Sequence, residues 1–192
     1  MSVFDIAILG DSLTKDRNAR NWPIYLEHYL QSGKSQRVRT YLFGQEGTNS
    51  STGLTQYTPM IGLRPRVAVI AYINDANAAV ISLATSLSNY NTIINNLKAG
   101  SPSTAIYVAS ISRPTAASEA ATFANIAGLQ TQLASITTNQ SLAGFIDGYT
   151  AWGDPALNPS EYDVGDGIHP LLPGHLRVTI PLWASVFAPL IT

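Results

Sequence analysis

Short apolar runs, each followed by glycine or polar residues, recur along the chain and predict the strands of a β-sheet. The run at 67–73 is unbroken, which is typical of a strand buried on both faces of a parallel sheet. The segment 37–43 alternates apolar and polar positions, and this alternation also predicts a strand. The predicted strands are 3–9, 37–43, 67–73, 105–111 and 142–146.

Apolar positions that recur every three or four residues predict helices between these strands. The predicted helices are 22–33, 83–100, 116–136 and 172–187, and the segments 14–21, 44–53 and 148–167 are predicted to be loops or irregular. Gly100 closes the second helix. Pro181 must kink or shorten the last helix, because proline has no N–H to donate to the preceding turn.

Strands and helices therefore alternate along the whole chain, and this order predicts an α/β protein. The expected architecture is a flavodoxin-like three-layer α/β/α sandwich with a mainly parallel, five-stranded sheet. No repeat or linker divides the sequence, so we expect a single domain over residues 1–192. In such a sheet the ligand site lies beyond the carboxyl ends of the strands.

The composition is that of a globular protein, with 45% apolar and 12% charged residues in a chain of 192. The 11 Lys and Arg are scattered and the formal net charge is −1, so nucleic acid is not an expected partner. The chain has no cysteine, which excludes disulfides, thiolate metal sites and cysteine catalysis.

The first residues contain no basic leader, and Asp5 interrupts their apolar run, so neither a signal peptide nor a membrane anchor is expected. No other segment approaches the ~20 apolar residues that a membrane-spanning helix needs. We expect a soluble protein with no membrane partner, and the sequence leaves its compartment and oligomeric state open.

The first candidate for chemistry is Ser12, within Gly10-Asp11-Ser12-Leu13-Thr14 at the end of the first predicted strand. A nucleophilic serine needs an exposed hydroxyl, a fixed backbone and nearby N–H groups for an oxyanion, and a strand that turns at glycine supplies these. The alternative interpretation is that Asp11 and Ser12 only cap a turn, as these residue types commonly do.

The second candidate is Asp166-Gly167-Ile168-His169-Pro170 in the late loop. A hydroxyl nucleophile needs a base, and the base needs a carboxylate that holds its tautomer and stabilises its cation. Asp166 and His169 can meet locally if the turn folds back, and Gly167 makes such a turn easy. The alternative is a helix start that Asp166 caps, with His169 incidental.

Two further strand ends carry candidate oxyanion donors. Asn74 follows the third strand, and a neutral amide there can donate to an oxyanion without altering the pKa of the base. Gly47 follows the second strand and could present its backbone N–H at close range. Taken singly, both are equally compatible with ordinary turns. Together with Ser12, Asp166 and His169 they would gather a nucleophile, its base and oxyanion donors at one edge of the sheet.

With these residues in order, the sequence resembles the SGNH hydrolases, also called GDSL-type esterases and lipases. The four letters of that name match Ser12, Gly47, Asn74 and His169. Further matches are the stretches 10–13 and 47–54, Asn74-Asp75, and the stretch 166–170 followed by Pro173-Gly174. These blocks cover nearly the whole chain.

The resemblance implies that His169 Nε2 takes the Ser12 proton while Asp166 orients the ring. It also implies that the Ser12 and Gly47 N–H groups and the Asn74 side chain hold the oxyanion. No metal and no organic cofactor is implied. The family's third block usually has Gly two residues before Asn, where this sequence has Tyr72. Tyr72 is therefore expected beside the oxyanion site, where it could contact the substrate or crowd the acyl pocket.

The expected substrate is a small-molecule or glycan ester with a short, acetyl-type acyl group. The loop 158–164 and the aromatic residues Trp152, Tyr162 and Tyr72 could line its site, although packing is the better interpretation for Trp152. One alternative is a non-catalytic glycan-binding or structural module on the same fold. Another is a nucleotide- or phosphate-binding protein, which is disfavoured because no glycine-rich phosphate motif follows the first strand.

Overall fold

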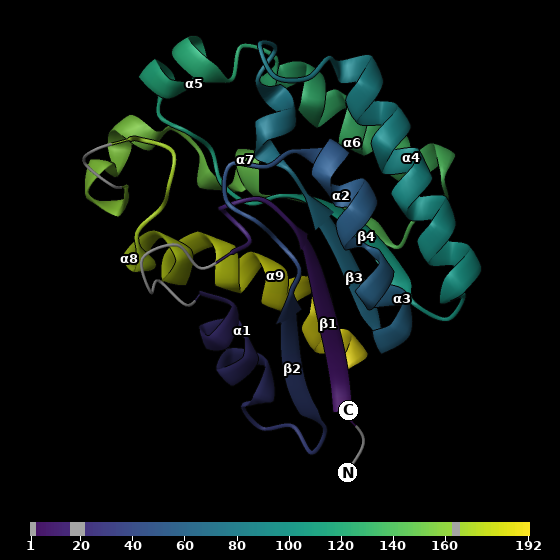
Figure 1. Ribbon diagram of the computed structural model, residues 1–192. Coiled ribbons are helices and arrows are strands. Elements are labelled where there is room, and N and C mark those ends of the chain that lie inside the picture. The colour runs from purple at the N-terminus through teal and green to yellow at the C-terminus, as the bar shows by residue number, and fades with distance from the viewer. Residues whose placement is uncertain (1–2, 16–21, 163–165) are drawn as a thin grey trace.

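A computed structural model of the chain describes residues 3–15, 22–162 and 166–192. Five strands form a single sheet in the order β2-β1-β3-β4-β5, and every neighbouring pair is parallel (Figure 1). The strands are β1 (Val3–Gly10), β2 (Arg37–Leu42), β3 (Val67–Ala71), β4 (Ala105–Ser110) and β5 (Gly144–Asp147). This strand order is the flavodoxin-like one. The predicted fold class is therefore confirmed, with a sheet that is parallel throughout.

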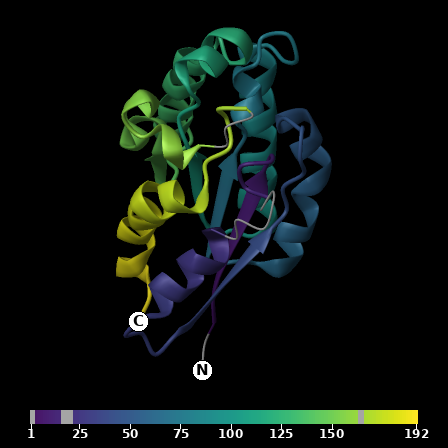
Figure 2. The same ribbon diagram turned by 90° about the vertical axis from the view of Figure 1, so that its left-hand side faces the viewer.

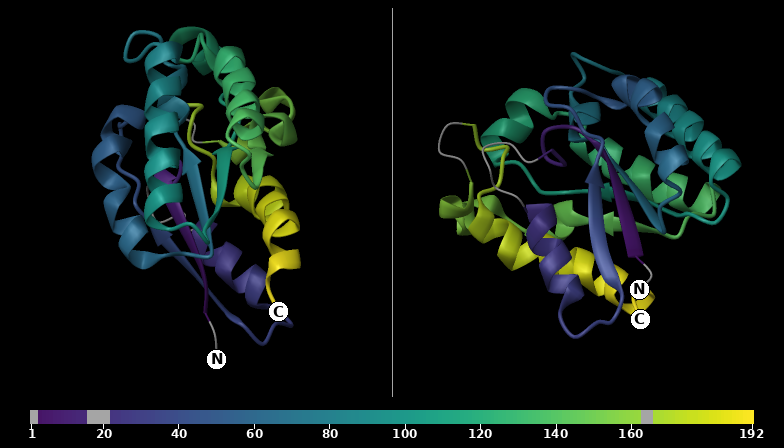
Figure 3. Two further views of the ribbon diagram at one scale, coloured as in Figure 1. Left: turned by 90° about the vertical axis from the view of Figure 1, so that its right-hand side faces the viewer. Right: turned by 60° about the horizontal axis from the view of Figure 1, so that its bottom comes forward.

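Helices cover both faces of the sheet, as Figures 2 and 3 show. On one face, α1 packs beside α9, and α9 reaches β5; on the other face α2 packs against α4, and α4 against α6. The helices are α1 (Trp22–Gln31), α2 (Ser50–Gln56), α3 (Thr58–Leu63), α4 (Leu83–Gly100), α5 (Ala116–Thr122), α6 (Ile126–Asn139), α7 (Gly148–Trp152), α8 (Leu172–Gly174) and α9 (Ile180–Phe187).

The central strands are buried because both of their faces are covered. All five residues of β3 are buried, as are the last five of β1. Between the sheet and the α1–α9 layer, the Trp22 and Trp183 rings meet edge to face at 5.0 Å between centroids. Removing a buried aromatic ring of this kind typically costs about 3–5 kcal/mol. The core thus fixes the strand ends from which the site residues emerge.

Three elements differ from those that the sequence predicts. The predicted loop 44–53 contains the start of α2, which Asn49 caps by accepting the Ser51 N–H at 2.9 Å. The predicted helix 116–136 is divided into α5 and α6, because Phe123 leaves helical geometry and its ring is buried. Strand β3 ends earlier than predicted, since Ile73 begins the short 3-10 helix η2 (Ile73–Ala76).

The late segment 148–167 is more regular than predicted. It contains α7 and the 3-10 helices η3 (Pro155–Leu157) and η4 (Pro159–Glu161). Asp154 caps η3 by accepting the Ala156 N–H. Short proline-initiated turns carry little periodic signal, which is why the pattern of apolar residues does not predict them. The parts of the predicted loops that fall on 16–21 and 163–165 lie outside the described residues.

The C-terminal helix accommodates Pro181 in the manner that the sequence predicts, by interruption. Between α8 and α9 the chain widens into the π-helical segment η5 (His175–Thr179), whose last turn ends with the Ile180 N–H donating to His175 O. Pro181 therefore falls at the start of α9, where a missing N–H costs little.

Candidate active site

The Ser12 turn begins where β1 runs closest to β3. A Cβ on Gly10 would lie well inside van der Waals contact with the Ala71 carbonyl oxygen, so only glycine fits there. The Thr14 and Lys15 N–H groups donate to Asp11 O at 3.1 and 3.0 Å, which closes a helical turn. Ser12 is thus in the first turn, where N–H groups have no partner within the turn itself.

The Asp166 turn folds a carboxylate back onto the ring of His169, as the sequence predicts. Asp166 Oδ1 accepts the Ile168 and His169 N–H groups at 2.8 and 2.9 Å, and Oδ2 lies 2.7 Å from His169 Nδ1. Gly167 makes the turn possible with a φ of +61°. On the other side of the ring, His169 Nε2 lies 2.8 Å from Ser12 Oγ. Ser12, His169 and Asp166 therefore form one continuous chain of polar contacts.

The charge state of Asp166 follows from this turn. Burial raises the pKa of its carboxyl, but the hydrogen bonds from the His169 and Ile168 N–H groups and from the His169 ring outweigh burial and leave the pKa below its ordinary value. His169 itself is only 7% exposed. The ring is thus shielded from water and has an ionised carboxylate on one of its nitrogens.

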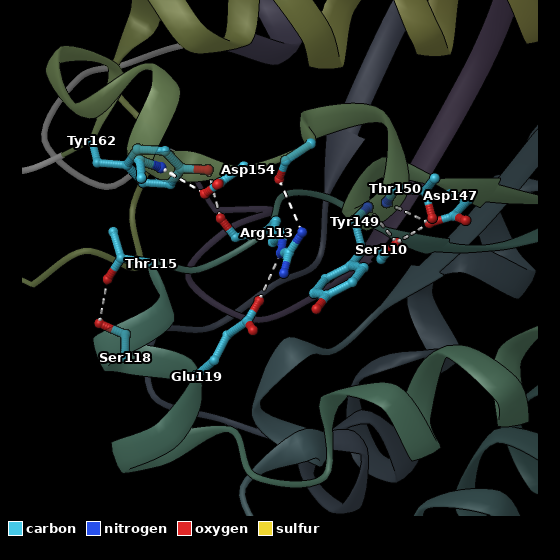
Figure 4. Close-up of polar contacts among 12 residues, drawn as sticks. Ser110, Arg113, Thr115, Ser118, Glu119, Asp147, Tyr149, Thr150, Asp154 and Tyr162 are labelled. Carbon is cyan, nitrogen blue, oxygen red and sulfur yellow. Dashed lines mark hydrogen bonds and ion pairs between the residues drawn. The ribbon is translucent and has the colours of Figure 1, made fainter.

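The start of α5 packs on the Asp166 turn, and a hydrogen bond of 3.1 Å joins the hydroxyls of Thr115 and Ser118 within it (Figure 4). The Thr115 N–H donates to Gly167 O at 2.8 Å, and Ser118 Oγ donates to Asp166 O at 2.7 Å. A Cβ on Gly167 would overlap the Thr115 hydroxyl. This clamp was not predicted from the sequence, because Thr115 and Ser118 lie about 50 positions away from their partners.

Beside the clamp, Arg113 organises a polar wall (Figure 4). Its Nε lies 3.0 Å from Glu119 Oε1, and its guanidinium carbon lies 4.8 Å from the centre of the Tyr149 ring. The Tyr162 hydroxyl donates to the Arg113 carbonyl at 2.5 Å. This cluster was not predicted from the sequence, although a cation six residues before a glutamate, in a loop at a strand end, is a signal that could have indicated it.

A surface hollow of about 510 Å³ opens between α5 and the late segment. Its lining combines polar side chains with apolar ones and includes Thr115, Ser118, Asp154, Pro155, Tyr162 and Gly167. The hollow therefore lies next to the turn that carries Asp166.

The candidate oxyanion donors are joined to the Ser12 turn by hydrogen bonds. The Asn74 backbone N–H donates to Asp11 Oδ2 at 3.2 Å, and its side-chain Nδ2 donates to Thr48 O at 2.8 Å. Gly47 precedes Thr48, is exposed and has a φ of +68°. The loops that carry Ser12, Gly47 and Asn74 are thus linked through Asp11 and Thr48.

The side chain of Tyr72 is directed into the core. Its side chain is 1% exposed, and its ring meets the Tyr90 ring edge to face at 6.4 Å. A Cβ on Gly53 would touch its hydroxyl, so the ring points between the sheet and α2. This burial argues against the expected contact of Tyr72 with a substrate: strand β3 turns the residue before η2 toward the core.

The other aromatic candidates also pack within the protein. Trp152 is 3% exposed and donates its Nε1–H to Ile111 O at 3.1 Å, which agrees with a packing role. Tyr162 lines the hollow beside Asp166 but is itself only 3% exposed. The predicted loop 158–164 lies partly outside the described residues. The His175 ring stacks on the Trp22 ring at 5.6 Å between centroids.

In residues 3–15, 22–162 and 166–192, no group of three or more His, Asp and Glu side chains is arranged to hold a metal ion. Within those ranges no helix combines the length and apolar character needed to cross a bilayer.

Comparisons with known proteins give one family and one fold. Residues 8–177 match the GDSL-like Lipase/Acylhydrolase family. Comparison with curated proteins gives no match.

Among solved structures, a lipase/acylhydrolase from Enterococcus faecalis aligns with a TM-score of 0.81 at 18% identity, over 100% of this chain and 98% of that one. A catalytic mutant of an acetylxylan esterase from Geobacillus stearothermophilus gives 0.74 at 16% identity, over 98% and 94% of the two chains. A psychrotrophic esterase from a Pseudoalteromonas species gives 0.77 at 13% identity, over 97% and 98%. At such identities these likenesses establish the fold.

Proposed function

The chain belongs to the GDSL-like lipase/acylhydrolase family, and we propose that it is a serine ester hydrolase with Ser12, His169 and Asp166 as its catalytic triad. Family membership supports ester hydrolysis as the general reaction. Two distances support the assignment of these residues: Ser12 Oγ lies 2.8 Å from His169 Nε2, and His169 Nδ1 lies 2.7 Å from Asp166 Oδ2. Both distances suit proton transfer and orientation of a general base.

In the proposed reaction, Ser12 Oγ attacks the ester carbonyl carbon while its proton moves to His169 Nε2. The imidazolium then gives this proton to the alcohol oxygen, the C–O bond breaks, and the acyl group remains on Ser12. Water attacks the acyl-enzyme by the same path and releases the acid. Asp166 accepts the Nδ1–H throughout, which leaves the Nε2 lone pair facing Ser12.

The negative charge on the carbonyl oxygen needs donors that are already in position. We assign the Ser12 and Gly47 N–H groups and the Asn74 side-chain amide to this task. Asn74 Nδ2 carries two hydrogens, of which Thr48 O accepts one at 2.8 Å. The second hydrogen is left for the oxyanion. Its orientation is fixed by the first bond, which is the form of preorganisation that such a donor requires.

For the substrate we propose a short-chain, acetyl-type ester carried by a small alcohol or a carbohydrate. The hollow next to the Asp166 turn, with its hydroxyl, carboxylate and proline lining, supports an alcohol part that is polar and compact. The acetylxylan esterase named above shares the fold, and acetylxylan is an ester of the proposed kind. The remaining alternative is a glycan-binding or structural module without turnover.

Covalent labelling with a fluorophosphonate tests the nucleophile. The wild type should be labelled and should hydrolyse 4-nitrophenyl acetate, whereas Ser12→Ala should lose the label and about 10³-fold or more of the turnover. Ser185→Ala is the matched control, because Ser185 is exposed on α9 and its hydroxyl donates to Leu182 O at 2.7 Å within the same helix. A folded wild type that takes no label and shows no turnover would favour the binding module.

The same assay tests the acyl group. Acetyl esters, including acetylated xylooligosaccharides, should be hydrolysed with higher kcat/KM than octanoyl or palmitoyl esters. A clear preference for long acyl chains would contradict the acetyl-type assignment while leaving the triad assignment intact.

A further inference from the structure

Asp11 is a completely buried carboxyl group directly beside the proposed nucleophile. Its exposed fraction is 0%, and both of its oxygens are occupied by backbone N–H donors from different turns. Oδ1 accepts the Leu13 N–H at 3.0 Å, within the Ser12 turn. Oδ2 accepts the Asn74 N–H at 3.2 Å, at the start of η2. One side chain therefore joins the turn of the nucleophile to the turn of the side-chain oxyanion donor.

We propose that Asp11 is a positioning residue, whose carboxylate sets Asn74 against Ser12 so that the oxyanion donors act together. This inference rests on the proposed function, because it needs Asn74 to be an oxyanion donor. The link is required because Ser12 and Asn74 belong to separate loops after β1 and β3. An error of about 1 Å between reacting groups can cost about 100-fold in rate.

The chemistry of the two contacts explains why a carboxylate is needed at this position. Both partners are N–H donors, so both side-chain oxygens must be acceptors. Asparagine has nearly the same shape but only one acceptor oxygen. In Asp11→Asn, an NH₂ group must face either the Leu13 or the Asn74 N–H, and two donors that face each other separate. The substitution thus breaks one contact while preserving the volume and the polarity of the side chain.

Asp75 provides a matched comparison, because it is buried, adjacent to Asn74 and also accepts two hydrogen bonds. Its Oδ1 accepts the Ser50 N–H at 2.8 Å, but its Oδ2 accepts from a hydroxyl, Ser86 Oγ, at 2.5 Å. A hydroxyl can reverse its role and accept from an amide. The side chain of Gln132 can turn to accept the Ser86 proton instead. Asp75→Asn can therefore keep its contacts with the Ser50 N–H and with Ser86 Oγ, whereas Asp11→Asn must lose one of its two N–H contacts.

An alternative is that Asp11 only closes the Ser12 turn, since aspartate commonly bonds the N–H two residues ahead. The Leu13 contact alone would fit this role. The Asn74 contact, 63 residues away in sequence, does not. Asp11→Ser separates the two roles, because a serine hydroxyl can still accept the Leu13 N–H but is too short to reach Asn74 as well. This variant is also the safeguard if Asp11→Asn fails to fold.

A double-mutant cycle in the full chain tests the inference with 4-nitrophenyl acetate as substrate at about pH 8, above the pKa of Asp11, where its carboxyl group is ionised. Asp11→Asn and Asp11→Ser should each lower kcat about tenfold or more, with KM within about twofold, because oxyanion contacts form only in the transition state. Asn74→Ala should lower kcat about 100-fold. In the Asn74→Ala background, adding Asp11→Asn should cost less than about threefold, since no side-chain donor remains to be positioned. Circular dichroism and thermal melting establish that each variant is folded.

The possible outcomes distinguish a failure of the proposed function from a failure of the role inferred for Asp11. Wild-type protein that hydrolyses no ester and takes no fluorophosphonate label overturns the proposed function and this inference together. An active wild type whose Asp11→Asn and Asp11→Ser variants retain full kcat overturns the inference alone. Full additivity with Asn74→Ala, or a loss in Asp75→Asn as large as that in Asp11→Asn, also overturns it, because both results describe general loosening of the core.

Discussion

At the scale of single residues, Asp166 has two functions that one substitution separates. Its Oδ1 holds the turn by accepting the Ile168 and His169 N–H groups, and its Oδ2 faces His169 Nδ1 at 2.7 Å. In Asp166→Asn the amide oxygen can keep the turn, while the NH₂ group must point at Nδ1. The ring then accepts at Nδ1 and carries its proton on Nε2, so it cannot take the Ser12 proton.

We therefore expect Asp166→Asn to fold with little loss of stability and to lose about 10³–10⁴-fold in kcat. The measurement is the steady-state hydrolysis of 4-nitrophenyl acetate together with a thermal melt. Asp147→Asn is the control, since Asp147 caps α7 by accepting the Thr150 N–H through one oxygen at 2.9 Å. An Asp166→Asn variant with near wild-type kcat would remove Asp166 from the proposed triad.

The sequence predicted the candidate residues unevenly. Asp166 and His169 are three positions apart, so a local turn is enough to join them, and the structure contains that turn. Ser12 and His169 are far apart in sequence, and their contact follows only from the parallel sheet and the family resemblance. The directions of the Asp11 and Tyr72 side chains could not be predicted. At these strand ends they depend on η2 and α2, whose sequences carry no periodic signal.

At the scale of elements, α5 and the Asp166 turn test how closely packing controls the site. Gly167 and Gly33 both have positive φ, +61° and +72°, so alanine is strained at either position. Gly167 is packed, because a Cβ there meets Thr115 and Ser118, whereas a Cβ on the exposed Gly33 meets nothing within 4 Å. The pair therefore separates backbone strain from displacement of α5.

Both Gly167→Ala and Gly33→Ala should lose about 1–2 kcal/mol of unfolding free energy from the backbone conformation. Gly167→Ala should lose more than Gly33→Ala and, in addition, at least about tenfold in kcat, because the carboxylate moves away from His169. Urea unfolding and the esterase assay measure the two effects. Equal kcat in both variants would mean that α5 does not hold the Asp166 turn in its working position.

The strands and the longest helix were predicted from the sequence because their signals are strong. β3 is an uninterrupted apolar run, and α4 has apolar residues every three to four positions. α2 was missed because its sequence, SSTGLTQ, is polar and contains glycine. Its first turn is held instead by distant groups: Asp75 accepts the Ser50 N–H, and Asn89 Nδ2 donates to Ser50 Oγ at 3.1 Å.

At the scale of the whole molecule, the fold buries two carboxyl groups, those of Asp11 and Asp75, just beyond the carboxyl ends of β1 and β3. Burial raises the pKa of Asp11 from 3.8 to about 7, even though hydrogen bonds from the Leu13, Asn74 and Ile73 N–H groups lower it. Burial likewise raises the pKa of Asp75, which lies close enough to repel Asp11. The fold therefore stores a cost at the site that the remaining core must offset.

This cost predicts a dependence of stability on pH. Between pH 3.8 and about 7, folded Asp11 keeps a proton that the unfolded chain has released. Its stabilising contribution is therefore complete below this window and is lost as the pH rises through it. Asp75 acts in the same direction, and Asp166, with its lowered pKa, acts only at lower pH. Over the range from about pH 5 to about pH 8, the Asp11 contribution should fall by about 2–3 kcal/mol.

Asp11→Asn removes the titrating group, so urea unfolding of wild type and variant at about pH 5 and about pH 8 isolates it. The wild type should lose about 2–3 kcal/mol more unfolding free energy than the variant across this range, since all other groups titrate in both proteins. Parallel profiles for wild type and Asp11→Asn would show that Asp11 stays ionised throughout, and that its N–H donors compensate for burial in full.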